Sequence, residues 1–239
     1  MIAWTWKVFA FALLAKATGL YLSLRQKRAV ESNRAAVPAR FSEKVSLAAH
    51  QKAADYTSAK LRMGSVARIW GLLLLIIWTV GGGLQWLSDI SASFELSVVW
   101  SGVVFMLLFF VISALIDLPM ELYGTFAIEA RFGFNKMTMA LFFSDMAKQL
   151  LLMLVIGAPL AWVILTLMQS TGELWWLYAW LFWTAFMLLM IWAYPTFIAP
   201  LFNKFEPLPD GEMKSTIEAL LTRCGFKSNG LFVMDGSKR

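Results

Sequence analysis

Acidic, aromatic and basic residues crowd together between Asp117 and Met137, a stretch that is flanked by two long apolar runs. Glu121 and Glu129 are eight residues apart, a spacing that places both carboxylates on roughly the same face of a helix. Ionisable side chains beside a membrane tend to face water or one another. The sequence therefore predicts an interfacial helix, at about 118–132, that presents a polar working surface.

Structural roles for residues in this stretch are also compatible with the spacing. Glu129 and Arg131 are two residues apart and do not face each other on a helix, so either could pair with another segment and hold the fold. Asn135 follows Gly133 and suits a turn as well as a substrate contact.

Metal chemistry needs more ligands than the sequence offers. Zinc sites use three or four protein ligands, whereas the chain has one histidine, His50, and one cysteine, Cys224. We interpret His50 as a solvated surface residue and Cys224 as a small core residue, and a single cysteine excludes an internal disulfide. No catalytic residue and no metal ligand is therefore assigned within this sequence.

Two long strings, LPMELYGTFAIEARFGFNK from Leu118 and PTFIAPLFNKFEPLPDGE from Pro195, carry a resemblance to a known family. They resemble the amino-terminal half of the CAAX prenyl protease 1 family, which consists of integral-membrane zinc metalloproteases. The resemblance implies a zinc-activated water that attacks a peptide carbonyl, with the glutamate of an H-E-x-x-H motif as general base. That motif lies beyond the second string in the family, and the sequence ends at Arg239 without it. We therefore expect this chain to bind no zinc and to be inactive alone, with zinc bound by the full-length parent.

The resemblance also implies that this half forms a chamber wall and part of a substrate-entry rim. Four residues match the first string and are candidates for that rim: Glu121, Glu129, Arg131 and Asn135. Asn203 and Lys204 lie in the second string and are candidates for bracing the last apolar run against a catalytic domain.

Composition indicates a membrane protein. Of 239 residues, 59% are hydrophobic and only 15% are charged, against about a quarter charged in soluble domains. The net charge of +6 does not indicate nucleic-acid binding, because the basic residues gather beside apolar runs rather than among aromatic residues on one exposed face. The predicted fold class is all-α, a polytopic membrane protein.

Five apolar runs are predicted to cross the membrane, because about 20 residues at about 1.5 Å each span a hydrocarbon core of about 30 Å. We expect Pro159 to kink the fourth span and Tyr194-Pro195 to end the fifth. The predicted membrane domain covers residues 1–203, with spans at about 4–24, 69–88, 96–116, 149–168 and 174–194.

Basic residues predict the orientation. Residues 25–68 contain ten Lys or Arg against three acidic residues, so this loop is expected in the cytoplasm, with the amino end outside and the carboxyl end inside. An amphipathic helix at about 42–68, capped by Ser42, is predicted to run straight into the second span. In the interfacial helix, Pro119 suits the first turn and Gly133 suits the left-handed end. The expected location is a bacterial inner membrane, or the endoplasmic reticulum in a eukaryote.

Residues 204–239 are predicted to begin a cytoplasmic catalytic domain that is truncated here. Asp210 can cap a helix that Gly225 ends. Residues 231–234 read as a strand, and the sequence offers no second soluble strand to accept its hydrogen bonds. The partner strand is therefore expected in the absent remainder of the domain.

Three functions are compatible with these observations. The leading one is the membrane half of a zinc metalloendopeptidase, with membrane lipid, a missing carboxyl-terminal catalytic domain and peptide substrates as partners, and no nucleic acid. The second is a non-catalytic membrane scaffold or regulator that is complete at 239 residues. The third is a small transporter, which would need polar groups near mid-membrane on several spans, and the second, third and fifth spans offer almost none.

Overall fold

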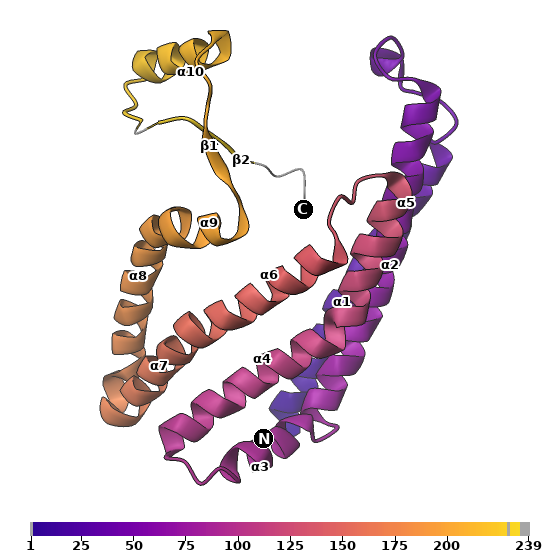
Figure 1. Ribbon diagram of the computed structural model, residues 1–239. Coiled ribbons are helices and arrows are strands. Elements are labelled where there is room, and N and C mark those ends of the chain that lie inside the picture. The colour runs from indigo at the N-terminus through magenta and orange to yellow at the C-terminus, as the bar shows by residue number, and fades with distance from the viewer. Residues whose placement is uncertain (1, 229, 235–239) are drawn as a thin grey trace. The chain divides into compact units, whose positions relative to one another are not determined.

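The computed structural model describes residues 2–228 and 230–234, which are mostly helical (Figure 1). The chain divides into two compact units, Met1–Asn135 and Lys136–Arg239.

The first unit begins with two long helices that pack against each other, α1 (Ile2–Ser32) and α2 (Leu47–Thr79). They form a hairpin through residues 33–46, which include a short 3-10 turn at Ala39–Phe41. Polar contacts join α2 to α1 and to the loop that follows α1. Arg34 donates hydrogen bonds from Nε and Nη2 to the two carboxylate oxygens of Asp55, at 2.7 and 2.8 Å. Further along, Arg68 Nη1 donates to the hydroxyl of buried Ser23 at 2.6 Å.

The predicted amphipathic helix does run without a break into the next apolar segment, but its start was predicted wrongly. Ser46 is the cap, because its hydroxyl accepts a hydrogen bond from the Ala49 N–H at 3.2 Å. Ser42 instead donates to the carbonyl of Ala39 at 2.8 Å, within the turn that precedes the helix. Nor is His50 simply solvated: its half-buried ring places Nε2 2.9 Å from the carbonyl oxygen of Asn33.

The helix that carries the second predicted span ends earlier than residue 88. α2 ends at Thr79, and a glycine-rich turn follows in which Gly82 has a φ of +80°. A left-handed residue cannot continue an α-helix, so the chain turns and starts a new helix, α3 (Gly83–Ala92). α3 packs against α4 (Val98–Leu122), the next long apolar helix.

The predicted separate interfacial helix is instead the continuation of α4. Pro119 lies inside α4 rather than in a first turn, and the chain passes into a π-helical segment, Tyr123–Glu129, and then α5 (Ala130–Phe132). The π-helical turns let the chain stay helical beyond the proline while changing the residue spacing. The predicted end is confirmed, because Gly133 closes the helix with a φ of +77°.

The second unit begins with one long helix. In it α6 (Met139–Leu152) continues into α7 (Ala158–Ser170) through a π-helical segment, Met153–Gly157, so that Pro159 lies in the first turn of α7. A short 3-10 turn, Gly172–Leu174, leads to α8 (Trp175–Ala193), which packs against α7.

The expectation that Tyr194-Pro195 ends the last apolar helix is wrong. A π-helical segment, Tyr194–Ile198, carries the chain past this proline into α9 (Ala199–Phe202). The proline removes one backbone donor, and the wider helical turn absorbs that loss without ending the helix.

The tail differs from its prediction in two respects. The second strand does exist: β1 (Phe205–Pro207) pairs antiparallel with β2 (Phe232–Met234), with Phe205 opposite Met234. Asp210 does not cap α10 (Glu212–Arg223), whose first turn has no side-chain cap, and pairs with Lys214 instead. The helix does end as predicted, at Gly225 with a φ of +72°.

Four helical segments of the described residues are long and apolar enough to cross a membrane: Leu47–Thr79, Val98–Phe132, Met139–Ser170 and Gly172–Phe202. α1 is not among them, so five spans are not confirmed. Only 6% of each apolar window is buried inside the protein, which leaves large side chains such as Leu188 and Ile191 on the outside. Such surfaces match a lipid environment.

A first prediction concerns the turn between α2 and α3. Replacing Gly82 by Ala should lower the free energy of unfolding by about 1 kcal/mol, because a side chain is strained at a φ of +80° even though the space around it is open. Gly211→Ala is the matched control, since Gly211 has extended backbone and open space. Denaturant titration in micelles measures both variants, and equal stabilities would contradict the role of the left-handed turn.

A second prediction concerns pH and the start of α10. Lys214 Nζ donates to an Asp210 carboxylate oxygen at 2.6 Å, which holds the pKa of Asp210 below its ordinary value of about 4. The pair thus stabilises this turn above about pH 4, and the stabilisation is lost as pH falls through the lowered pKa. Carboxyl-carbon NMR should show Asp210 titrating below the ordinary range, and Lys214→Gln should raise its pKa. An unchanged midpoint in that variant would refute the pairing.

Candidate functional site

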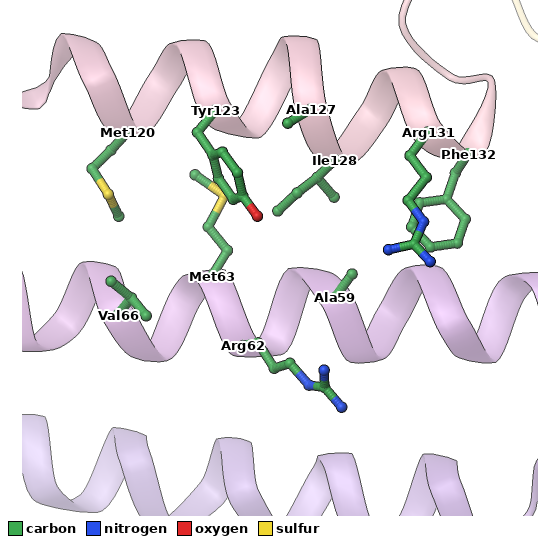
Figure 2. A pocket seen from close by; sticks show the side chains of 10 residues that line it. All are labelled: Ala59, Arg62, Met63, Val66, Met120, Tyr123, Ala127, Ile128, Arg131 and Phe132. Carbon is green, nitrogen blue, oxygen red and sulfur yellow. The ribbon is translucent and has the colours of Figure 1, made fainter.

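A groove with a volume of about 450 Å³ lies in the first unit between α2 and the helix that continues from α4 through α5 (Figure 2). Most of the side chains that line it are apolar, and the polar ones are one tyrosine and two arginines. α2 contributes Ala59, Arg62, Met63 and Val66, and the facing helix contributes Met120, Tyr123, Ala127, Ile128, Arg131 and Phe132.

An aromatic cluster closes one end of this groove. The Tyr56 ring lies 5.3 Å from the ring of buried Phe132 and 4.7 Å from that of Phe134, measured between centroids. Lys52 Nζ lies 5.8 Å from the centre of the Phe134 ring. These contacts hold the turn that follows α5 against α2, far from it in sequence.

Glu129 is fixed at the same end by both its side chain and its backbone. Its carboxylate accepts a hydrogen bond from Lys60 Nζ at 3.1 Å, and the Lys60 ammonium also lies 5.5 Å from the centre of the Tyr56 ring. The Glu129 carbonyl oxygen accepts hydrogen bonds from the N–H groups of Phe134 at 2.9 Å and Asn135 at 3.3 Å. The ion pair thus ties the candidate rim stretch to α2, and a substrate contact by Glu129 or Asn135 stays a prediction.

Glu121 and Arg131 occupy different surroundings from Glu129. Glu121 is exposed on α4, and no Lys, Arg or His side chain in the described part of the chain lies within 4.0 Å of its carboxylate. The π-helical segment separates it from Glu129, so the 3.6-residue spacing behind the predicted common face does not hold. Arg131 is exposed on α5, and its guanidinium lies 5.8 Å from the centre of the Phe132 ring.

Asn203 and Lys204 belong to the second unit. Asn203 follows α9 with extended backbone and donates its N–H to the carbonyl of Ala199 at 2.9 Å, so it ends the helix. Lys204 is exposed directly before β1. The structure therefore places both at the junction between the last apolar helix and the tail, and their proposed bracing role stays a prediction.

The sequence analysis did not identify several residues that make structural contacts. Lys60 and Tyr56 contact residues about 70 positions further along the chain, and nothing local signals those contacts. Asp145 is buried and pairs with Lys148, 3.4 Å between Oδ1 and Nζ. That pair has the i, i+3 spacing of helical neighbours, which is a signal that the sequence does contain.

Metal ligands do not come together in the part of the chain that the structure describes. No three His, Cys, Asp or Glu side chains there are grouped so that they could hold a metal ion. These residues therefore do not fit a zinc site, and no chemical step through zinc can be assigned to them.

Long apolar helices with lipid-compatible outer faces define an integral-membrane helical protein. The chain belongs to the CAAX prenyl protease family: the family model described as "CAAX prenyl protease N-terminal, five membrane helices" matches residues 26–204.

Individual relatives and a solved structure agree with this assignment. The CAAX prenyl protease 1 homolog of Caenorhabditis elegans is 36% identical over 92% of this chain and 48% of its own length. CAAX prenyl protease 1 of Saccharomyces cerevisiae is 32% identical over 100% of this chain and 54% of its own length. The crystal structure of S. mikatae Ste24p matches the whole chain with a TM-score of 0.93 and 30% identity, and the match covers 57% of that protein. The chain spans about half the length of these relatives.

A third prediction ranks the contacts at the end of the groove. Tyr56→Ala should lower the free energy of unfolding by about 2 kcal/mol, because it removes two aromatic contacts. Lys60→Met should cost only about 0.5 kcal/mol, because the side chains of Lys60 and Glu129 are 52% and 34% exposed and water screens the pair. Denaturant titration in micelles compares the two variants. A larger loss for Lys60→Met would mean that the ion pair, not the aromatic packing, holds this end together.

Proposed function

We propose that this chain is the amino-terminal membrane domain of a zinc metalloendopeptidase of the CAAX prenyl protease 1 type. In this proposal it forms a chamber wall and part of the substrate-entry rim, and a carboxyl-terminal catalytic half supplies the zinc site. The observation that carries the proposal is the match to S. mikatae Ste24p, which extends over all of this chain but only 57% of that structure. A domain of this size, without a metal site in its described residues, needs a second half for zinc chemistry.

We propose that α1 is the fifth membrane span. Lys16 would be costly there if it faced lipid. A Cβ atom placed on Gly71 of α2 would lie 3.5 Å from Lys16 Nζ, so the ammonium group passes beside α2. Arg68 reaches back in the same way, to Ser23 of α1. These contacts direct the charged ends of Lys16 and Arg68 toward protein rather than lipid. The cost of placing both helices in the membrane is lower as a result.

The proposed orientation puts the amino end outside and the carboxyl end in the cytoplasm. It is supported by the excess of seven positive charges in residues 25–68. The proposed location is a bacterial inner membrane, or the endoplasmic reticulum in a eukaryotic cell. Peptide or protein chains are the proposed substrates.

For the entry rim we propose the stretch that carries Glu121, Glu129, Arg131 and Asn135. Glu121 and Arg131 are exposed, so a substrate can reach them. Glu129 is half-buried and held by Lys60 at 3.1 Å, which fixes its carboxylate in one place. A carboxylate held in one place can orient a peptide at low entropic cost.

The proposal is tested by measuring zinc content and peptide cleavage. We expect the purified chain to hold far less than one zinc ion per chain and to show no chelator-sensitive cleavage of a reporter peptide. Produced together with a catalytic half that carries H-E-x-x-H, it should form a complex with about one zinc ion and cleave the peptide. Chelator-sensitive cleavage by this chain alone, or failure of the two halves to assemble into an active complex, would overturn the proposal.

A fourth prediction separates a substrate contact from a structural role for Glu129. In the assembled enzyme, Glu129→Gln should lower kcat/KM about tenfold while zinc content stays unchanged, because a charge-assisted contact with substrate is lost. Lys60→Met breaks the same ion pair but keeps the carboxylate, and it should lower kcat/KM much less. Equal losses in the two variants would show that Glu129 acts only by holding the fold.

A further inference from the structure

We propose that the groove between α2 and the α4–α5 helix binds one anionic phospholipid. An acyl chain would lie along the apolar part of the groove, and the headgroup phosphate would bind the Arg131 guanidinium. This lipid site goes beyond the proposed peptidase function and does not depend on a catalytic half.

The groove changes from apolar to cationic along its length. Val66 and Met120 lie at one end, and Arg131 lies beside Phe132 at the other (Figure 2). Met120 and Phe132 are twelve residues apart along this helix. Both walls belong to helices that are apolar enough to cross a membrane. A groove of this kind, apolar toward the span and cationic at the helix end, matches an amphiphile with its head at the membrane surface.

Arg131 is the cation available for a phosphate. Its side chain points from α5 toward α2 in Figure 2. Across the described residues, no acidic side chain lies within 4.0 Å of its guanidinium. Arg62 also lines the groove but differs, because its guanidinium points away from the α4–α5 helix and lies 3.9 Å from Glu31 of α1. A guanidinium binds phosphate through two parallel hydrogen bonds, so Arg131 suits this ligand better than a lysine would.

The acidic groups near Arg131 are already paired. Asp55 accepts two hydrogen bonds from Arg34, at 2.7 and 2.8 Å. Glu129 accepts one from Lys60 at 3.1 Å. The charge of Arg131 also acts on the Asp55 carboxylate, at longer range than that of Arg34, but neither carboxylate forms an ion pair with it. The three cations Arg34, Lys60 and Arg131 thus face two carboxylates at this end of the groove. Charge complementarity favours an anion here, and the apolar walls favour one that carries a hydrocarbon chain.

Native mass spectrometry tests the proposal on the whole chain. The protein is purified from nanodiscs that contain equal amounts of phosphatidylcholine and phosphatidylglycerol, and the lipids that stay bound are identified. We expect one retained phosphatidylglycerol per chain. Arg131→Gln should reduce its retention about fivefold, and Ala59→Phe should reduce it as well, because the new ring fills the groove.

Arg223→Gln is the matched control, since it removes the same charge from exposed α10 in the second unit and should leave retention unchanged. The thermal unfolding midpoint of each variant checks that it is folded. Millimolar inorganic phosphate should not displace the lipid, because phosphate lacks the acyl chain. Equal retention of the two lipids by the unaltered protein would overturn the proposal. Retention unchanged in Arg131→Gln, or displacement by phosphate alone, would do so too.

Discussion

Close packing of α2 against the π-helical segment Tyr123–Glu129 is the constraint on which the described site depends. Gly124 faces Met63 at this contact, where a Cβ atom would lie 2.9 Å from the end of the flexible Met63 side chain. In this arrangement Tyr56 contacts Phe132 and Phe134, and Lys60 reaches Glu129. The groove is the space left beside these contacts. A segment that ended at Pro119 would bring none of these residues to α2.

Structural features that depend on neighbouring residues were predicted from the sequence, and features that depend on contacts between distant residues were missed. The continuous helix into the second apolar run and the glycine ends at Gly133 and Gly225 follow from periodicity and backbone freedom, and they were predicted. The π-helical turns near Pro119 and Pro195 were not, because a proline usually argues for a break. β1 was missed because it has three residues, one of them Pro207, and is stabilised only by β2. In the candidate site, Glu129 could be chosen from its type and place, whereas its partner Lys60 is 69 residues away and could not.

Different forces hold the two sides of α2. On the α1 side they include hydrogen bonds between Arg68 and Ser23 of α1 and between Asp55 and Arg34, which follows α1. On the α4–α5 side they are aromatic and aliphatic, with one half-exposed ion pair. Lipid tails are as apolar as leucine, so the burial of apolar side chains alone does not drive helices together in a membrane. Hydrogen bonds and close packing between the helices drive their association instead.

The same arrangement bears on the proposed entry rim. The Glu129 side chain pairs with Lys60 of α2, and the Phe134 ring of the following turn packs on Tyr56 of α2, all within one compact unit. In the proposed peptidase, a rim held in this way would keep its geometry whether or not the catalytic half is bound, so its conformational entropy would be lost when the domain folds rather than when substrate binds. Glu129 forms an ion pair with Lys60, whereas no acidic side chain of the described residues lies within 4.0 Å of the Arg131 guanidinium. This difference between two residues of one turn is why we propose different partners for them, a peptide chain for Glu129 and an anionic lipid for Arg131.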